Sequence, residues 1–194
     1  MNAANVPVLQ EEDLPHYTYD DYVCWEGRWE IINGIPYAMT PSPLIEHQDL
    51  CGDIFVQLKT LLKNCPKCKP LLPVDWQISE DIIVQPDVMV VCGEREKIIG
   101  KTLSIPPVLI FEILSPSTRR KDKVLKYRLY QEAGVKYYCI VDPETSITEI
   151  FQLIADKYRG KDDTPEEKLT FDLGPCRIDF DFAEIFKEMI DRPI

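Results

Sequence analysis

The segment PPVLIFEILSPSTRRKDK, residues 106–123, constrains the fold more than any other part of the chain. We predict a strand from Val108 to Leu114, because branched apolar residues fill it and prolines bound it on both sides. Its side chains alternate between two faces, with Leu109, Phe111 and Ile113 on one and Ile110, Glu112 and Leu114 on the other. Both faces are apolar, as in a strand buried on both sides. An ionised, unpaired Glu112 is very costly there, so it must be protonated, paired with a cation or bound to a metal ion.

A second acid lies in a similar apolar setting. Asp87 stands inside IIVQPDVMVV, directly after Pro86. Proline cannot donate a hydrogen bond to a sheet, so it marks an edge, a bulge or a strand start, where the next side chain can face a site. We expect Asp87 and Glu112 to lie side by side on neighbouring strands. Each acid alone could bond backbone amides or an arginine, but two adjacent carboxylates favour a hard divalent cation such as Mg²⁺.

Charge is distributed unevenly along the chain. Residues 11–30 hold seven acids against Arg28 alone and carry a net charge of −6, whereas residues 117–128 carry +5. A solvated helix face is the ordinary interpretation of a basic run, but this one begins three residues after the strand of Glu112 ends, which favours contact with an anionic substrate. The candidate DNA-contacting residues are Arg119, Arg120, Lys121 and Lys123. The total charge of −11 opposes a protein that coats nucleic acid over its whole surface.

The remaining pattern predicts one α/β domain, residues 17–194, after a loose arm of residues 1–16. A chain of 194 residues, 45% of them hydrophobic, has enough material for one substantial core. Asn33-Gly34 predicts a type I′ turn. The predicted elements are a short helix from Thr18 to about Trp25, a hairpin over 29–39, a helix from Ser42-Pro43 to about Lys63, strands over 71–79 and 82–91, a basic helix from Ser117 or Thr118 to Gly134, a strand in VKYYCIVDPET, further strands, and a helix over about 182–190.

The cysteines predict the compartment. Seven cysteines at irregular spacing suit free thiols in a reducing environment better than a disulfide framework. Cys65 and Cys68 have the spacing of half a zinc site, but no second such pair completes it, so we expect a turn with two free thiols. No apolar run approaches the length of a membrane span and the acidic N-terminus resembles no secretory signal, so we expect a cytoplasmic protein without membrane contact.

Four segments together carry a resemblance to a known family. They are WEIINGIPYAM, PSPLIEHQDL, PDVMVV and FEILSPSTRRKDKVLKYRLYQEAGVKYYCIVDP, in that order, and they span roughly residues 17–145. The sequence resembles a bacterial family of restriction-endonuclease-like proteins within the PD-(D/E)XK nuclease superfamily. The resemblance implies a restriction-endonuclease-like α/β (α+β) fold, with a mixed, partly parallel sheet flanked by helices.

The resemblance also implies a site. Asp87 and Glu112 match the two acids that hold Mg²⁺, for which Mn²⁺ can substitute, in a phosphodiesterase that cleaves DNA. Glu30 matches a further acid of the family, and His47 matches a histidine that could approach the site, although it could equally cap or pack its helix.

One position departs from the superfamily motif. Leu114 stands where the motif has a lysine that activates water and offsets phosphate charge. The family supplies that lysine from the following helix, and Lys126 is the matching residue. Asp122, Lys126 and Tyr130 are four residues apart and share one helical face, whereas Val124, Leu125 and Leu129 are available for packing. Lys126 could instead serve only to neutralise Glu112.

Two classes of function therefore stay open. The first is a Mg²⁺-dependent DNA endonuclease with Glu30, Asp87, Glu112 and Lys126 as its catalytic residues. The second is a non-catalytic binding or interaction module on the same fold, whose acids pair with Lys126. We expect a homodimer, and Asp122, Tyr130 and His47 to support the site.

Overall fold

The computed structural model describes residues 13–39, 44–94, 98, 102–161 and 168–191. Most of the expected N-terminal arm, residues 1–16, lies outside these ranges, as do Ser42 and Pro43 at the expected start of the long helix. No helix within the described ranges is both long and apolar enough to cross a membrane.

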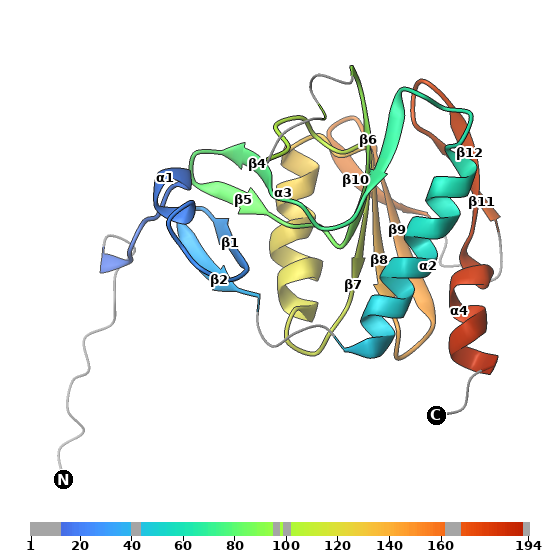
Figure 1. The fold of residues 1–194 in the computed structure, drawn as a ribbon, viewed down its shortest axis with the longest axis horizontal. Coiled ribbons are helices and arrows are strands. Elements are labelled where there is room, and N and C mark those ends of the chain that lie inside the picture. Colours follow the sequence, from blue (N-terminus) through green and yellow to red (C-terminus); the bar gives the residue numbers. More distant parts are fainter. Residues whose placement is uncertain (1–12, 40–43, 95–97, 99–101, 162–167, 192–194) are drawn as a thin grey trace, which may run out of the picture.

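A six-stranded mixed sheet forms the centre of the fold, as predicted (Figure 1). Its order is β10-β9-β8-β7-β6-β3, and β7 and β8 are parallel while the other neighbours are antiparallel. The strands are β3 (Cys68–Leu71), β6 (Val88–Cys92), β7 (Leu109–Ile113), β8 (Tyr137–Asp142), β9 (Ile147–Ile154) and β10 (Lys157–Lys161). All five residues of β7 are buried, which confirms a strand covered on both faces.

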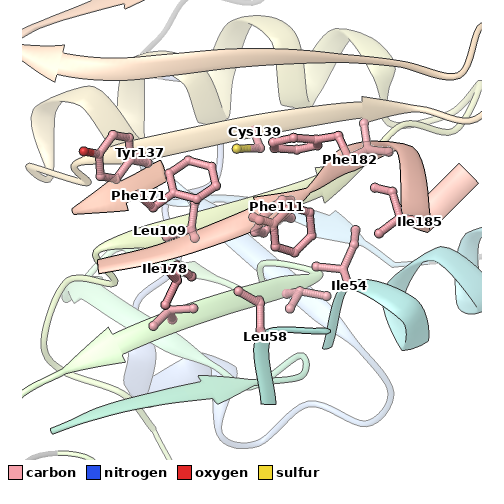
Figure 2. Close-up of a cluster of buried hydrophobic side chains, with 14 of the residues drawn as sticks. Ile54, Leu58, Leu109, Phe111, Tyr137, Cys139, Phe171, Ile178, Phe182 and Ile185 are labelled. Carbon is pink, nitrogen blue, oxygen red and sulfur yellow. The ribbon is translucent and has the colours of Figure 1, made fainter. Parts of the chain in front are cut away.

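Helices flank the two faces of this sheet (Figure 1). One face packs against α2 (Ile45–Leu61), α4 (Phe182–Asp191) and the hairpin of β11 (Lys168–Asp172) and β12 (Arg177–Asp181). The other face lies under a helix that begins as a π-helix, η3 (Lys121–Lys126), and continues as α3 (Tyr127–Glu132). An apolar core lies on each face of the sheet. The predicted alternation of β7 is confirmed, because Phe111 lies in the core on the side of α2 and α4 (Figure 2) and Ile110 in the core on the side of α3.

A smaller four-stranded sheet, ordered β2-β1-β5-β4, stands beside the large one. It contains β1 (Trp29–Ile32), β2 (Ile35–Ala38), β4 (Trp76–Ser79) and β5 (Ile82–Val84), and α1 (Tyr19–Tyr22) precedes it. Asn33 and Gly34 have φ angles of 53° and 73°, which confirms the type I′ turn. Thr18 and Asp21 form the predicted cap of α1, with the Thr18 N–H donating to Asp21 Oδ2 at 2.9 Å, but the helix ends at Tyr22, before the expected Trp25.

The two strands predicted over 71–79 and 82–91 are wrong as continuous elements. The first is divided into β3 and β4, and the second into β5 and β6. Prolines explain both breaks, since Pro73 and Pro86 lie between the strands and have no N–H for a ladder. At Pro86 the chain leaves the small sheet and enters the large one, so Asp87 stands directly before β6.

The expectation of seven free thiols is also wrong. Disulfides join Cys65 to Cys176 and Cys68 to Cys92, across 111 and 24 residues of sequence. Cys68 and Cys92 are directly opposite in the β3–β6 pairing. Such contacts depend on tertiary structure, which is why spacing alone did not predict them. Among the described cysteines, Cys24, Cys51 and Cys139 form no disulfide.

Candidate active site

The pairing of β6 with β7 brings Asp87 and Glu112 together. Val88 is opposite Phe111, so the next pair along the antiparallel ladder is Asp87 and Glu112. Residues that face each other across an antiparallel pair point to the same side of the sheet. Both acids line a pocket of about 890 Å³, whose wall also includes residues of η3 and the hairpin residues Tyr37 and Ala38.

Glu112 is paired with a cation inside the protein. Its Oε1 accepts hydrogen bonds from Lys126 Nζ at 2.9 Å and from the Tyr130 hydroxyl at 2.7 Å. The three residues are at most 2% exposed. Burial raises the pKa of Glu112 well above its usual range, and the charges of Asp87, Asp122 and Glu30 add to this against the opposing effect of Lys126. One lysine therefore does not satisfy this carboxylate.

Glu30 lies behind Lys126, on β1 of the small sheet. It is fully buried, and its Oε1 accepts from the Gln85 N–H and lies 2.9 Å from Lys126 Nζ. Its Oε2 accepts from Lys121 Nζ at 2.5 Å. Burial acts to raise the pKa of Glu30, but the charges of Lys126 and Lys121 bring it below its usual range. Glu30 thus holds the ammonium groups of Lys121 and Lys126 in place.

The π-helix explains how both lysines reach one carboxylate. Lys121 and Lys126 are five residues apart, and a π-helix bonds residues five apart, so both side chains leave from one side of η3. Short π segments are frequent at functional sites. The same winding makes part of the expected packing stripe wrong: Val124 and Leu125 are 38% and 37% exposed and line the pocket, whereas Leu129, in α3, is buried.

Asp87 is held from the opposite side by His47, in the first turn of α2. His47 Nε2 lies 3.2 Å from Asp87 Oδ2, which also accepts from the Ile113 N–H at 2.9 Å. Burial acts to raise the pKa of Asp87, yet the hydrogen bond and charge of His47 lower it below its usual range. The pKa of His47 is raised in return, because the bond to Asp87 outweighs burial.

Asp122 completes a group of four buried acids with Glu30, Asp87 and Glu112. Its Oδ1 lies 3.7 Å from Lys126 Nζ and has no hydrogen-bond partner among the described residues. Burial raises the pKa of this carboxyl too. Lys126 and Lys121 supply two positive charges to the four acids, and protonated His47 would supply a third. The four acids therefore outnumber the cations around them, and if all were ionised together they would carry uncompensated negative charge.

The position of the motif lysine holds a buried apolar side chain, as the sequence indicates. Leu114 is buried in the apolar core beneath α3, so its position faces away from solvent. The ammonium of Lys126 lies beside Glu112 instead.

Most of the basic run is engaged in ion pairs. Arg119 bonds Asp142 at 2.8 Å and Glu144 at 3.0 Å, and Lys123 bonds Glu149. Lys121 is the partner of Glu30 described above. Arg120 is exposed on the pocket wall and forms no ion pair with the described residues.

The sequence-based selection missed Arg28. This exposed arginine lines the pocket opposite η3, and its Nε donates to Gln85 Oε1 at 3.0 Å. Its signal was visible, since it is the one cation within the acidic stretch 11–30.

The acids fit a hard divalent cation. Glu112 Oε2 and Asp87 Oδ1 accept no hydrogen bond from any residue that the structure describes, so each acid has one oxygen to offer. Carboxylate oxygens are the ligands that Mg²⁺ and Mn²⁺ prefer. A softer set, His47, Cys51 and Asp87, also has ligand atoms within 4.8 Å of one another. Burial and the charge of Asp87 raise the pKa of the Cys51 thiol, however, which disfavours a thiolate ligand there.

A solved structure with the same fold comes from Anabaena variabilis. It is described as a putative nuclease belonging to DUF820, and it matches this chain with a TM-score of 0.72 at 16% sequence identity. The match covers 88% of this chain and 97% of the other. At this identity the likeness shows the fold, which is that of a restriction-endonuclease-like nuclease. No curated protein sequence matches the chain significantly.

The family is established by sequence. The pattern shared by the Uma2 family, described as "Putative restriction endonuclease", matches residues 19–174. That range contains both sheets, strand β11 of the β11–β12 hairpin, the whole pocket and all four buried acids. The chain therefore belongs to the Uma2 family of restriction-endonuclease-like proteins.

Proposed function

We propose that this protein is a divalent-metal-dependent DNA endonuclease, in which Asp87 and Glu112 hold Mg²⁺, or Mn²⁺ in its place. The family and the fold of the Anabaena nuclease support the general class. The observation that carries the proposal is the excess of buried acids over buried lysines in and behind the pocket wall. Four carboxylates share two lysines, and the two acids on the sheet each keep one oxygen free of hydrogen bonds from the described residues. A divalent cation would balance this charge.

The residues of the chain have distinct parts in hydrolysis. Bound Mg²⁺ would supply a Lewis acid that polarises a phosphate oxygen and lowers the pKa of water. Lys126, itself almost fully buried, places a fixed positive charge beside Glu112 at the pocket wall, where it can stabilise charge that develops on the phosphate. Tyr130 holds Glu112 in its orientation. His47 can take up or release a proton next to Asp87.

Glu30 acts as a positioning residue. It does not line the pocket formed by the described residues, but it bonds Lys121 and Lys126, which do. Its two oxygens therefore set where both ammonium groups stand. Arg28 and Arg120 flank the pocket and offer guanidinium groups to the DNA backbone.

A non-catalytic binding or interaction module is the second candidate. The observation in its favour is that Lys126 Nζ lies 2.9 Å from both Glu112 and Glu30, an arrangement that holds the acids without metal. A homodimer would suit either function, and it stays a prediction.

The test uses the purified full chain with supercoiled plasmid DNA and Mg²⁺ or Mn²⁺. We expect nicking that a chelator abolishes and that leaves a 5′-phosphate or 3′-phosphate end at each break. Asp87→Asn and Glu112→Gln should each lower the rate by about 10²–10³ or more, as expected for loss of a metal ligand or of preorganised charge.

The matched control is Asp179→Asn. Asp179 is an exposed acid on β12, and the β11–β12 hairpin packs on the face of the sheet opposite the pocket. The rate of this variant should equal that of the parent. Mn²⁺ titration by calorimetry separates the two candidates: binding without cleavage under any condition supports the interaction module, and absence of binding rejects the metal site.

A further inference from the structure

Four of the seven cysteines meet at one place, away from the pocket. Cys65 follows α2, Cys68 lies in β3, Cys92 ends β6, and Cys176 directly precedes β12. The Sγ atoms of Cys65, Cys68 and Cys176 all lie within 4.8 Å of one another, and Cys92 is bonded to Cys68. The two disulfides therefore lie next to each other, and their four sulfur atoms form one cluster.

The chain makes a tight turn between Cys65 and Cys68. The segment Cys65-Pro-Lys-Cys68 closes tightly, with the Cys68 N–H donating to the Cys65 carbonyl at 3.0 Å. The Gly93 N–H, next to Cys92, donates to the Lys67 carbonyl at 2.9 Å, so the two segments lie side by side. A C-x₂-C turn is a standard half of a structural zinc site.

The sequence alone offered no second half for this turn. The fold supplies it, with Cys92 from the end of β6 and Cys176 from the β11–β12 hairpin. In a tetrahedral site with Zn–S bonds of about 2.3 Å, the sulfurs stand roughly 3.8 Å apart. The 4.8 Å limit on three of the sulfurs is compatible with that spacing, and the fourth is adjacent.

The surroundings also suit a metal thiolate centre. Cys65 and Cys68 are each 6% exposed, and the other two cysteines pack against the same apolar core. Exposed Lys67 and Lys69 lie next to Cys68 in sequence and can offset the double negative charge of a zinc tetrathiolate.

We propose that Cys65, Cys68, Cys92 and Cys176 bind a structural Zn²⁺ ion in the reduced protein. Each disulfide accepts two electrons and two protons from one dithiol reductant, which becomes a cyclic disulfide. The four resulting thiols then release four protons as they bind one Zn²⁺. All four coordination positions are filled by the protein, so the site is closed and structural.

This site is independent of the proposed nuclease site. Asp87 precedes β6 and Cys92 ends it, and a strand rises about 3.4 Å per residue, which places the two sites at opposite ends of one strand, roughly 17 Å apart. Bound Zn²⁺ would tie the end of α2, the β3–β6 edge and the β11–β12 hairpin together.

The experiment measures metal content and the spectrum of Co²⁺ bound in place of Zn²⁺. The full chain is produced with added zinc and purified without oxygen in a dithiol reductant. We expect one zinc per chain. After exchange, Co²⁺ should give the near-ultraviolet thiolate charge-transfer absorption and the visible bands of tetrahedral cobalt, and removal of zinc should lower the melting temperature.

Variants locate the metal. Cys92→Ser and Cys176→Ser should each lose the four-thiolate Co²⁺ spectrum, whereas the matched control Cys24→Ser, an exposed free cysteine, should keep it. Asp87→Asn should keep it as well, which separates this site from the nuclease site. The proposal is overturned if the reduced parent, with seven titratable thiols, shows no thiolate–cobalt absorption. It is equally overturned if Cys92→Ser retains the parent's spectrum, or if the disulfides persist in excess reductant.

Discussion

The two faces of β7 show how differently one strand can be covered. On one face Phe111 packs against Phe171, Phe180 and Phe182 in a core without charged groups among its members (Figure 2). On the other, one residue further along, Glu112 enters a network of acids and lysines beneath η3 and α3. The first face is stabilised by burial of apolar surface, which does not depend on pH. The second requires a balance of charge, and it is the face that forms the pocket.

The charged face of β7 gives up stability that the apolar face keeps. A buried ion pair recovers its desolvation cost only with good geometry and full hydrogen bonding. Here Asp122 Oδ1 lacks a hydrogen bond among the described residues, and the pKa of Glu112 is raised by burial and by its neighbouring acids. The network is therefore incomplete in the absence of a further cation, whereas the apolar core needs no partner.

The largest effect is expected from Lys126→Ala. Its removal leaves Glu112 and Glu30 buried without their shared cation, and breaking such a pair costs about 3–5 kcal/mol. Nuclease activity should fall by at least 10²-fold as well. Urea denaturation gives the free energy of unfolding. The control Lys123→Ala, which removes a half-exposed pair with Glu149, should cost about 1 kcal/mol or less, and equal losses in the two variants would contradict the comparison.

Phe111→Ala should destabilise the protein by a similar amount through a different cause. The cavity and the lost apolar burial cost about 3–5 kcal/mol. Because no charge changes, the loss should be the same at pH 5 and pH 8, and Mn²⁺ affinity of the folded protein should match that of the parent. A loss that varies strongly with pH would mean that the two faces are coupled.

Glu112→Gln should change the free energy of unfolding by a smaller amount, and it should stabilise the protein instead of destabilising it. The pKa of Glu112 is raised in the folded state, so its contribution to stability is complete below the unfolded pKa and is lost as pH rises through the folded pKa. Without metal, the variant should therefore gain stability relative to the parent as pH rises from the unfolded pKa of Glu112 towards its raised folded pKa, by roughly 1 kcal/mol. Denaturation curves at several pH values in a chelator measure this. If Lys126 already balanced the charge of Glu112 fully, the difference in free energy of unfolding between variant and parent would stay constant with pH, and the prediction would be wrong.

The smallest effect is expected on the pocket wall. Arg120→Ala should reduce the salt dependence of DNA binding by roughly 1 in log–log slope, because one phosphate contact is lost. Arg119→Ala serves as the control, since its guanidinium is bonded to Asp142 and Glu144, and its slope should equal that of the parent. Fluorescence anisotropy of labelled DNA at increasing salt measures both. The reverse pattern would place the DNA on the other side of the helix.

Local patterns predicted the elements that local physics determines. The strand of Glu112, the Asn33-Gly34 turn and the mixed sheet follow from periodicity, turn chemistry and family resemblance, and the structure has them. The isolation of Asp87 and Glu112 in apolar strands likewise indicated their adjacency.

Features that depend on distant residues were not predictable in this way. The chain changes sheets at Pro86, and the disulfide partners of Cys65 and Cys68 come from other elements. The basic run looked available for DNA, yet Arg119 and Lys123 are paired with Asp142 and Glu149, beyond the next helix. Sequence spacing gives charge density, but only the fold decides which charges are already neutralised.

The π-helix makes chain length part of the site. An α-helix turns about 100° per residue, so the same residues wound as an α-helix would leave Lys121 and Lys126 about 140° apart around the axis. Only one of the two lysines could then reach Glu30. Deleting one residue between them would restore the four-residue spacing of one α-helical face, so a related sequence with a single gap here could place both lysines at Glu30 without a π-helix.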